Sequence, residues 1–88
     1  MMKENNEKLK QLTQTEKRNP VNSVAENIKE FRLAKALSQK ALGDAVGVSQ
    51  KAIDFWERGV NEPKATYIVR LADFFDVSCD VLLGRKPY

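Results

Sequence analysis

The chain contains no histidine and only one cysteine among its 88 residues. The absence of histidine removes the commonest general base and the commonest metal ligand of proteins. Because Cys79 is the single thiol, neither an internal disulfide nor a cysteine metal cluster can form. The sequence also lacks a glycine-rich phosphate loop and clustered carboxylates. We therefore expect no metal, no cofactor and no enzymatic activity.

Long hydrophobic runs are missing as well. No apolar stretch approaches the roughly 20 residues that a membrane-spanning helix needs, and the N-terminal sequence MMKENNEKLKQ has no apolar segment of the signal-peptide type. These absences favour a cytoplasmic protein with no membrane partner. A chain of 88 residues suits one small domain, whose modest core leaves little room for a catalytic cavity.

The net charge of +3 is mild, but the charges are unevenly distributed. Residues 29–51 contain five basic and two acidic residues, whereas residues 52–84 contain three basic and six acidic ones. One interpretation is a pair of solvated faces. The other is a basic surface that meets a polyanion such as nucleic acid. Charge alone leaves both interpretations open.

The pattern of apolar residues predicts an all-α protein without internal repeats. Residues 1–20 are charged and poor in apolar residues, so we expect an N-terminal arm that is disordered or a fraying helix. Residues 21–88 would form the folded domain. Apolar spacing, serine caps and glycine stops predict five short helices. Their expected bounds are Val24–Ala36, Gln39–Val46, Gln50–Arg58, Ala65–Phe75 and Cys79–Leu83.

The short distance in sequence between the second and third predicted helices indicates a known motif. They are joined by VGVS, a tight turn that contains Gly47. Two short helices connected in this way form a helix-turn-helix arrangement, whose second helix is offered to the major groove of DNA. Many small helical bundles contain such a pair, so the spacing alone is a moderate signal.

Two neighbouring aromatic residues divide the third helix into faces. If Ile53 points into the core, Trp56 lies about 60° from it and Phe55 about 160° from it. We therefore expect a buried Trp56 and a substantially exposed Phe55 that lies near the cations Lys51 and Arg58. The exposed ring would either contact a thymine methyl group in the groove or be covered by a neighbouring loop.

Other side chains on this helix could read bases. Gln50 and Lys51 begin the helix, at the end that enters the groove. A glutamine can bind adenine through two hydrogen bonds, and a lysine can donate to guanine. Asp54 could accept from a cytosine amine, although its carboxylate would repel phosphates. The base-reading candidates are Gln50, Lys51, Asp54 and Phe55.

Several motifs in order resemble the helix-turn-helix domain of the phage Cro and repressor type, the xenobiotic-response-element family. They are LSQ, VGVS, WERG, EP, DVS and LLG, and the resemblance covers about residues 24–84. It implies a compact, lambda-repressor-like bundle of bacterial or phage origin. The implied function is that of a sequence-specific transcriptional regulator, a repressor, which binds double-stranded DNA as a homodimer.

The resemblance also implies roles for polar residues outside the reading face. In the family, the residue that matches Gln39 touches a phosphate, and an arginine that matches Arg32 pairs with a glutamate that matches Glu57. We expect this pair to be a structural salt bridge. An aromatic at position 55 departs from the family, which often has a polar residue there. The candidates for phosphate contacts are Ser38, Gln39, Lys40, Ser49, Arg58 and Asn61.

A protein-interaction module is the alternative function, for example an antitoxin-like protein whose main partner is another, regulatory protein. The two functions can coexist in one chain. Salt dependence distinguishes them, because phosphate contacts make DNA affinity fall steeply with salt whereas an apolar interface changes little.

Overall fold

The computed structural model describes residues 22–87, so the predicted N-terminal arm lies outside the described residues. Helices account for all the regular secondary structure in this range, which confirms the all-α prediction. The helices are α1 (Val24–Ala34), α2 (Gln39–Val46), α3 (Gln50–Glu57), α4 (Ala65–Phe75) and α5 (Cys79–Leu82).

The predicted bounds are correct for α2 and α4 and too long for the other helices. α1 ends at Ala34, because the chain turns at Ala36, which has a left-handed φ of 57°. α3 and α5 each end one residue early, at their C-caps Arg58 and Leu83. Within residues 22–87, no helix combines the length and the apolar character needed to cross a bilayer.

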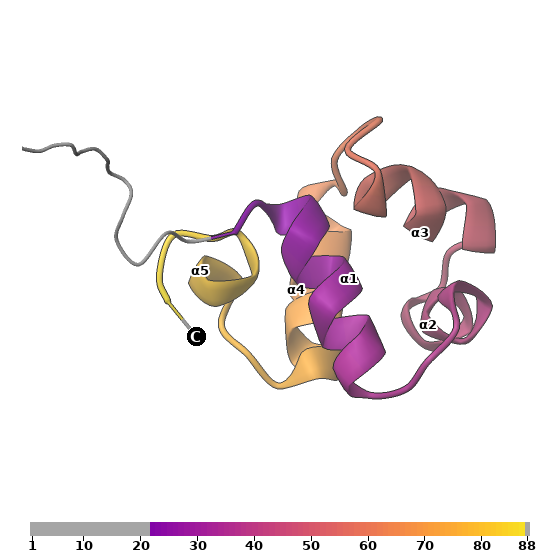
Figure 1. The fold of residues 1–88 in the computed structure, drawn as a ribbon, viewed down its shortest axis with the longest axis horizontal. Coiled ribbons are helices and arrows are strands. Elements are labelled where there is room, and N and C mark those ends of the chain that lie inside the picture. Colours follow the sequence, from indigo (N-terminus) through magenta and orange to yellow (C-terminus); the bar gives the residue numbers. More distant parts are fainter. Residues whose placement is uncertain (1–21, 88) are drawn as a thin grey trace, which may run out of the picture.

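α1 and α4 pack against each other at the centre of the domain (Figure 1). The Phe31 ring of α1 and the Phe75 ring of α4 lie 5.5 Å apart between centroids. α2 and α3 lie on one side of this central pair, and α5 lies on the other (Figure 1). The two-helix unit therefore rests on a packed support and has its outer surface free for contacts.

Serine side chains begin four of the five helices. Ser23 accepts from the backbone N–H of Glu26, whose carboxylate accepts from the N–H of Ser23, so the two residues form a capping box. The side chains of Ser38, Ser49 and Ser78 cap α2, α3 and α5, and each accepts one hydrogen bond from a backbone N–H group of its helix. α4 begins at Lys64 without a side-chain cap. These local signals explain why the helix starts could be predicted.

The core is apolar and includes residues from every helix. Trp56 is 7% exposed, which confirms its predicted place in the core. Its ring contacts Tyr67 of α4, with a centroid distance of 5.7 Å. Tyr67 is half-buried because its ring packs on Trp56. The buried hydrophobic residues are Ile28, Leu42, Val46, Ile53, Trp56, Ile68, Leu71, Ala72, Phe75 and Leu82.

Asn27 attaches the short α5 to α1. Its buried side-chain amide donates to the carbonyl oxygens of Val81 and Leu82, each at 3.1 Å. A helix of four residues has few bonds of its own, and its last carbonyls lack partners within the helix. Asn27 supplies partners for two of these carbonyls and thereby holds the end of α5 against α1.

Gly43 allows the turn to approach α2 closely. Its carbonyl accepts from the N–H groups of Gly47 and Val48, at 2.8 and 2.9 Å. A Cβ atom at position 43 would lie only 2.6 Å from the carbonyl oxygen of Val48. The residue costs helix propensity, but its missing side chain is what gives the turn room to fold back.

Gly43→Ala should therefore destabilise the domain, although helix propensity alone would favour alanine by about 1 kcal/mol. We expect a loss of about 1–3 kcal/mol in the free energy of unfolding, because backbone must move to admit the methyl group. Urea denaturation followed by circular dichroism measures this change. Ala45→Gly, at an exposed position of α2, is the control and should lose about 1 kcal/mol from propensity alone. An increase in stability for Gly43→Ala would contradict the close approach.

Candidate nucleic-acid interface

α2, the turn and α3 form the helix-turn-helix unit that the sequence predicted. Gly47 has a φ of 88° and ends α2, as expected for a left-handed C-cap. Leu42, Val46 and Ile53 are buried between the helices and the rest of the core. Gln50 and Lys51 are exposed at the N-terminus of α3. The end of α3 that would enter a groove is thus open to solvent.

Phe55 lies on the outer face of α3 together with two cations. The Nζ atom of Lys51 lies 5.8 Å from the ring centroid, and the guanidinium carbon of Arg58 lies 5.4 Å from it. These are cation–π distances. The ring is half-buried, so the prediction of substantial exposure is wrong in degree. Cations from the same helix cover part of the ring, which leaves a mixed apolar and basic surface.

Asp54, a candidate for base reading, binds two residues that were expected to contact phosphates, Gln39 and Arg58. Its Oδ1 atom accepts from Gln39 Nε2 at 3.3 Å, and its Oδ2 atom accepts from Arg58 Nε at 3.0 Å. The hydrogen bond from Gln39, followed by the interactions with Arg58, holds the pKa of Asp54 below its usual value. The carboxylate is therefore ionised at neutral pH. Two candidates for phosphate contacts are thus bound to a carboxylate of the same unit.

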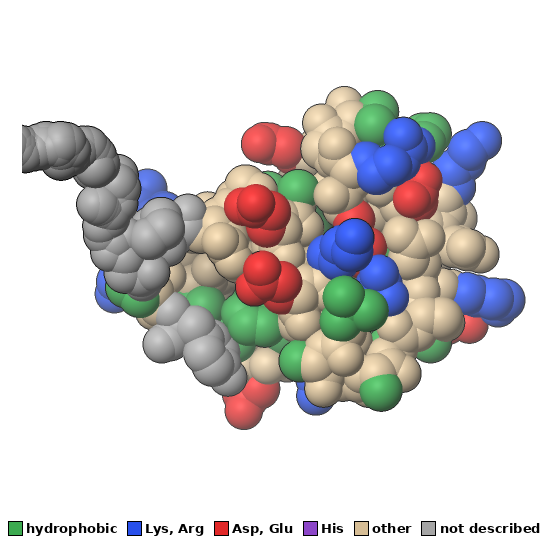
Figure 2. All heavy atoms as spheres, viewed as in Figure 1, with side chains coloured by type: hydrophobic (Ala, Val, Ile, Leu, Met, Phe, Trp, Pro, Cys, Tyr) green, Lys and Arg blue, Asp and Glu red, His purple; other side chains and the backbone are tan. Residues whose placement is uncertain are grey.

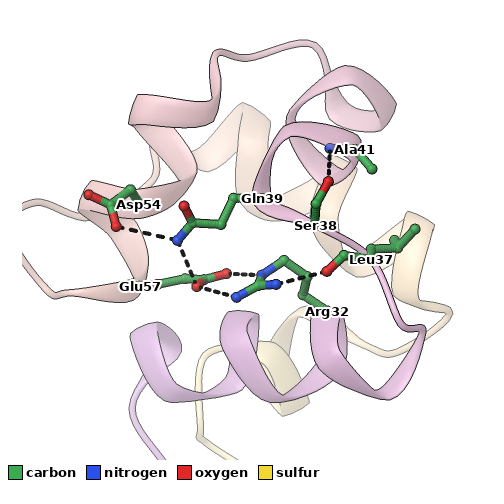
Figure 3. Close-up of polar contacts among 7 residues, drawn as sticks. All are labelled: Arg32, Leu37, Ser38, Gln39, Ala41, Asp54 and Glu57. Atoms are coloured by element: carbon green, nitrogen blue, oxygen red, sulfur yellow. Dashed lines mark hydrogen bonds and ion pairs between the residues drawn. The ribbon is translucent and has the colours of Figure 1, made fainter.

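Arg32 and Glu57 form the expected ion pair in bidentate geometry (Figure 3). The Nε and Nη2 atoms of Arg32 donate to the two carboxylate oxygens of Glu57, at 2.6 and 2.9 Å. The side chains are 10% and 3% exposed. The hydrogen bonds that Arg32 donates to Glu57 raise the pKa of Arg32 above its usual value. This pair joins α1 to the end of α3.

The pair has two further partners that no sequence motif indicated. The Nη1 atom of Arg32 donates to the carbonyl oxygen of Leu37 at 2.8 Å, and Gln39 Nε2 donates to Glu57 at 3.2 Å. Gln39 thus lies between Glu57 and Asp54 (Figure 3). No sequence signal identifies a backbone carbonyl as a partner. The LSQ motif did mark Gln39, but for a phosphate contact.

The remaining phosphate candidates lie at the surface of the same unit. Lys40 forms an exposed ion pair with Asp44 at 3.1 Å. The hydroxyl groups of Ser38 and Ser49 accept from the backbone as caps. Asn61 is exposed in the loop after α3. In the face shown in Figure 2, Lys and Arg side chains over α2 and α3 alternate with Asp and Glu side chains.

Residues 22–87 contain no group of three or more His, Cys, Asp or Glu side chains that could hold a metal ion. The polar groups of the two-helix unit are cations, carboxylates and amides, arranged around exposed helix N-termini. Such a surface can donate hydrogen bonds to anions and to base edges.

Comparison with known proteins agrees with this geometry. A family model described as helix-turn-helix matches residues 28–82, which include most of α1 and all of α2–α5. The chain belongs to this helix-turn-helix family. The resemblance drawn from the sequence motifs is thereby confirmed, and with it the lambda-repressor-like fold.

Two relatives of this helix-turn-helix protein come from Bacillus subtilis (strain 168). The uncharacterized HTH-type transcriptional regulator YqaE is 34% identical over 59 residues, which are 67% of this chain and 51% of the relative. The HTH-type transcriptional regulator AnsR is 33% identical over 61 residues, 69% of this chain and 53% of the relative. The chain spans about half the length of each of these relatives.

Solved structures show the same fold. The P22 c2 repressor in complex with synthetic operator 9T superposes with a TM-score of 0.70 and 35% identity, covering 74% of this chain and 98% of the repressor chain. The biofilm regulator SinR in complex with DNA gives a TM-score of 0.64 at 26% identity, over 68% of this chain and 97% of the SinR chain. The restriction-modification controller C.AhdI of Aeromonas hydrophila gives 0.63 at 29% identity, over 67% of this chain and 89% of the controller.

Glu57→Gln should strongly destabilise the domain, because it leaves the buried guanidinium of Arg32 without a countercharge. We expect a loss of about 3–5 kcal/mol in the free energy of unfolding, measured by urea denaturation. Asp44→Asn is the matched control, since it breaks an ion pair of exposed side chains and should change stability by less than about 1 kcal/mol. Equal effects for the two variants would show that Arg32 and Glu57 contribute no more than a surface pair.

Proposed function

We propose that this domain binds double-stranded DNA by placing α3 in the major groove, and that the protein regulates transcription as a sequence-specific repressor. The observation that carries the proposal is the two-helix unit, with the exposed N-terminus of α3 and the cations beside it. Membership of the helix-turn-helix family supports it. The likeness to the P22 c2 repressor, which was solved with an operator, gives further support.

Base reading falls to residues on the outer face of α3. Gln50 and Lys51 reach base edges from the N-terminal turn, and Phe55 offers apolar surface to a thymine methyl group. Asp54 already accepts one hydrogen bond on each carboxylate oxygen. A cytosine amine would have to use a remaining lone pair of these oxygens.

Phosphate contacts would come from both helix N-termini and their flanks. Backbone N–H groups at a helix start favour anions, and several side chains lie nearby. A homodimer would place two copies of α3 about one DNA turn apart, roughly 34 Å, and would bind a palindromic site in the cytoplasm. The side chains proposed for phosphate contacts are Ser38, Gln39, Lys40, Ser49, Arg58 and Asn61.

Selection from random duplexes, followed by two substitutions, tests this assignment. On the selected site, Gln50→Ala should lose about 1–3 kcal/mol of binding free energy and relax the preference at one base pair. Its affinity for unrelated duplexes should barely change, because an uncharged side chain releases no counterions. Phe55→Ala should weaken binding to a duplex that carries the contacted thymine. Replacing that thymine with uracil, which lacks the methyl group, should remove most of the difference in affinity between wild type and variant.

Thermal melting of both variants separates base reading from packing. If Phe55→Ala lowers the melting temperature strongly and leaves the base preference intact, the ring serves the fold and its proposed contact with DNA is wrong. If selection yields no preferred sequence, the proposal of sequence-specific binding fails as a whole.

A further inference from the structure

Two carboxylates lie beside two of the cations that are proposed to bind phosphates. Asp44 Oδ2 lies 3.1 Å from Lys40 Nζ on α2, and Asp54 Oδ2 lies 3.0 Å from Arg58 Nε at the end of α3. In each pair the residues are four apart, so they lie on the same face of the helix. A carboxylate and a phosphate are both anionic acceptors, and they compete for the same N–H donors.

The Asp54 carboxylate is the more firmly held of the two. It also accepts from Gln39, another phosphate candidate, whose amide bridges to the buried Glu57. The hydrogen bond from Gln39, followed by the interactions with Arg58, lowers the pKa of Asp54, so this carboxylate keeps its charge to a lower pH than an ordinary aspartate does. Arg58 also lies over the Phe55 ring, so it is bound on two sides before any DNA arrives. Asp44, by contrast, lies in an open pair whose side chains are 72% and 68% exposed.

We infer that Asp44 and Asp54 are specificity-determining residues that compete with DNA phosphates for Lys40 and Arg58 and so limit non-specific affinity. This inference rests on the proposed function. A phosphate that binds Lys40 or Arg58 must either displace the carboxylate from the cation or share the cation with it. If the cation is shared, the phosphate lies beside a like charge. This competition weakens phosphate contacts in specific and non-specific complexes alike. A non-specific complex loses the larger share of its binding free energy, because it has no base contacts that compensate for the loss.

Binding to a fluorescein-labelled duplex of arbitrary sequence, measured by anisotropy over a range of KCl concentrations, tests the inference. Asp44→Asn and Asp54→Asn should each raise the association constant about two- to fivefold, the range expected when an exposed ion pair is released. Asparagine at position 54 keeps one oxygen that can accept from Gln39 but loses the second oxygen and the charge that hold Arg58, so the fold should persist, and circular dichroism checks this. Asp73→Asn is the matched control, because it removes the same charge from an exposed position on α4.

A double-mutant cycle separates competition from a general change of charge. In an Arg58→Ala background, Asp54→Asn should no longer raise affinity, because the cation that it releases is gone. The same should hold for Asp44→Asn in a Lys40→Ala background. A gain that persists in these backgrounds, or that Asp73→Asn matches, overturns the inference.

The proposed function fails in a different way. If the wild-type chain binds no duplex even at low salt, DNA binding itself is wrong and the inference falls with it. If the wild type binds with a steep salt dependence but neither asparagine variant binds more tightly than Asp73→Asn, only the inference is overturned.

Discussion

The bidentate ion pair between Arg32 and Glu57 is the contact on which the geometry of the two-helix unit depends. A guanidinium and a carboxylate that share two hydrogen bonds have a fixed relative orientation. Ile28 anchors α1 in the core, so the bidentate pair between Arg32 and Glu57 fixes the end of α3 relative to that core. The same charges bind the carbonyl of Leu37 and the amide of Gln39, which flank the start of α2. Both helices of the unit are therefore positioned from one buried site, and the outer face of α3 is left for contacts.

Most of the fold could be predicted because its signals are local. A serine before an apolar run predicts a helix start, and Gly47 predicts the end of α2 through a backbone conformation that glycine adopts easily. The end of α1 carries no such signal, since an alanine takes the left-handed position there. The attachment of α5 through Asn27 spans 54 and 55 residues in sequence, and no spacing rule predicts a contact of that length.

The sequence predicted which side chains of the candidate site point toward the core and which point outward. It did not predict which side chains contact one another. Helical angles correctly separated the core residue Trp56 from Phe55, because direction follows from 100° per residue alone. They could not show that Lys51 and Arg58 fold back over the Phe55 ring, since long side chains choose among several rotamers. Gln39 donates to both Asp54 and Glu57. Predicting this contact would likewise require the relative positions of all three residues in the folded domain. Residues assigned separately to bases and to phosphates thus form one connected network.

The central claim is that α3 and the start of α2 form the surface that meets DNA. A titration of the ¹⁵N-labelled chain with a short duplex, followed through backbone amide chemical shifts, tests it most directly. We expect the largest shift changes at residues 38–40 and 49–55, where helix N-termini and the reading face would meet phosphates and bases. These changes should weaken as salt is added, because salt screens the phosphate contacts. Shift changes concentrated on α4 and α5, with α3 unperturbed, would show that another surface meets DNA.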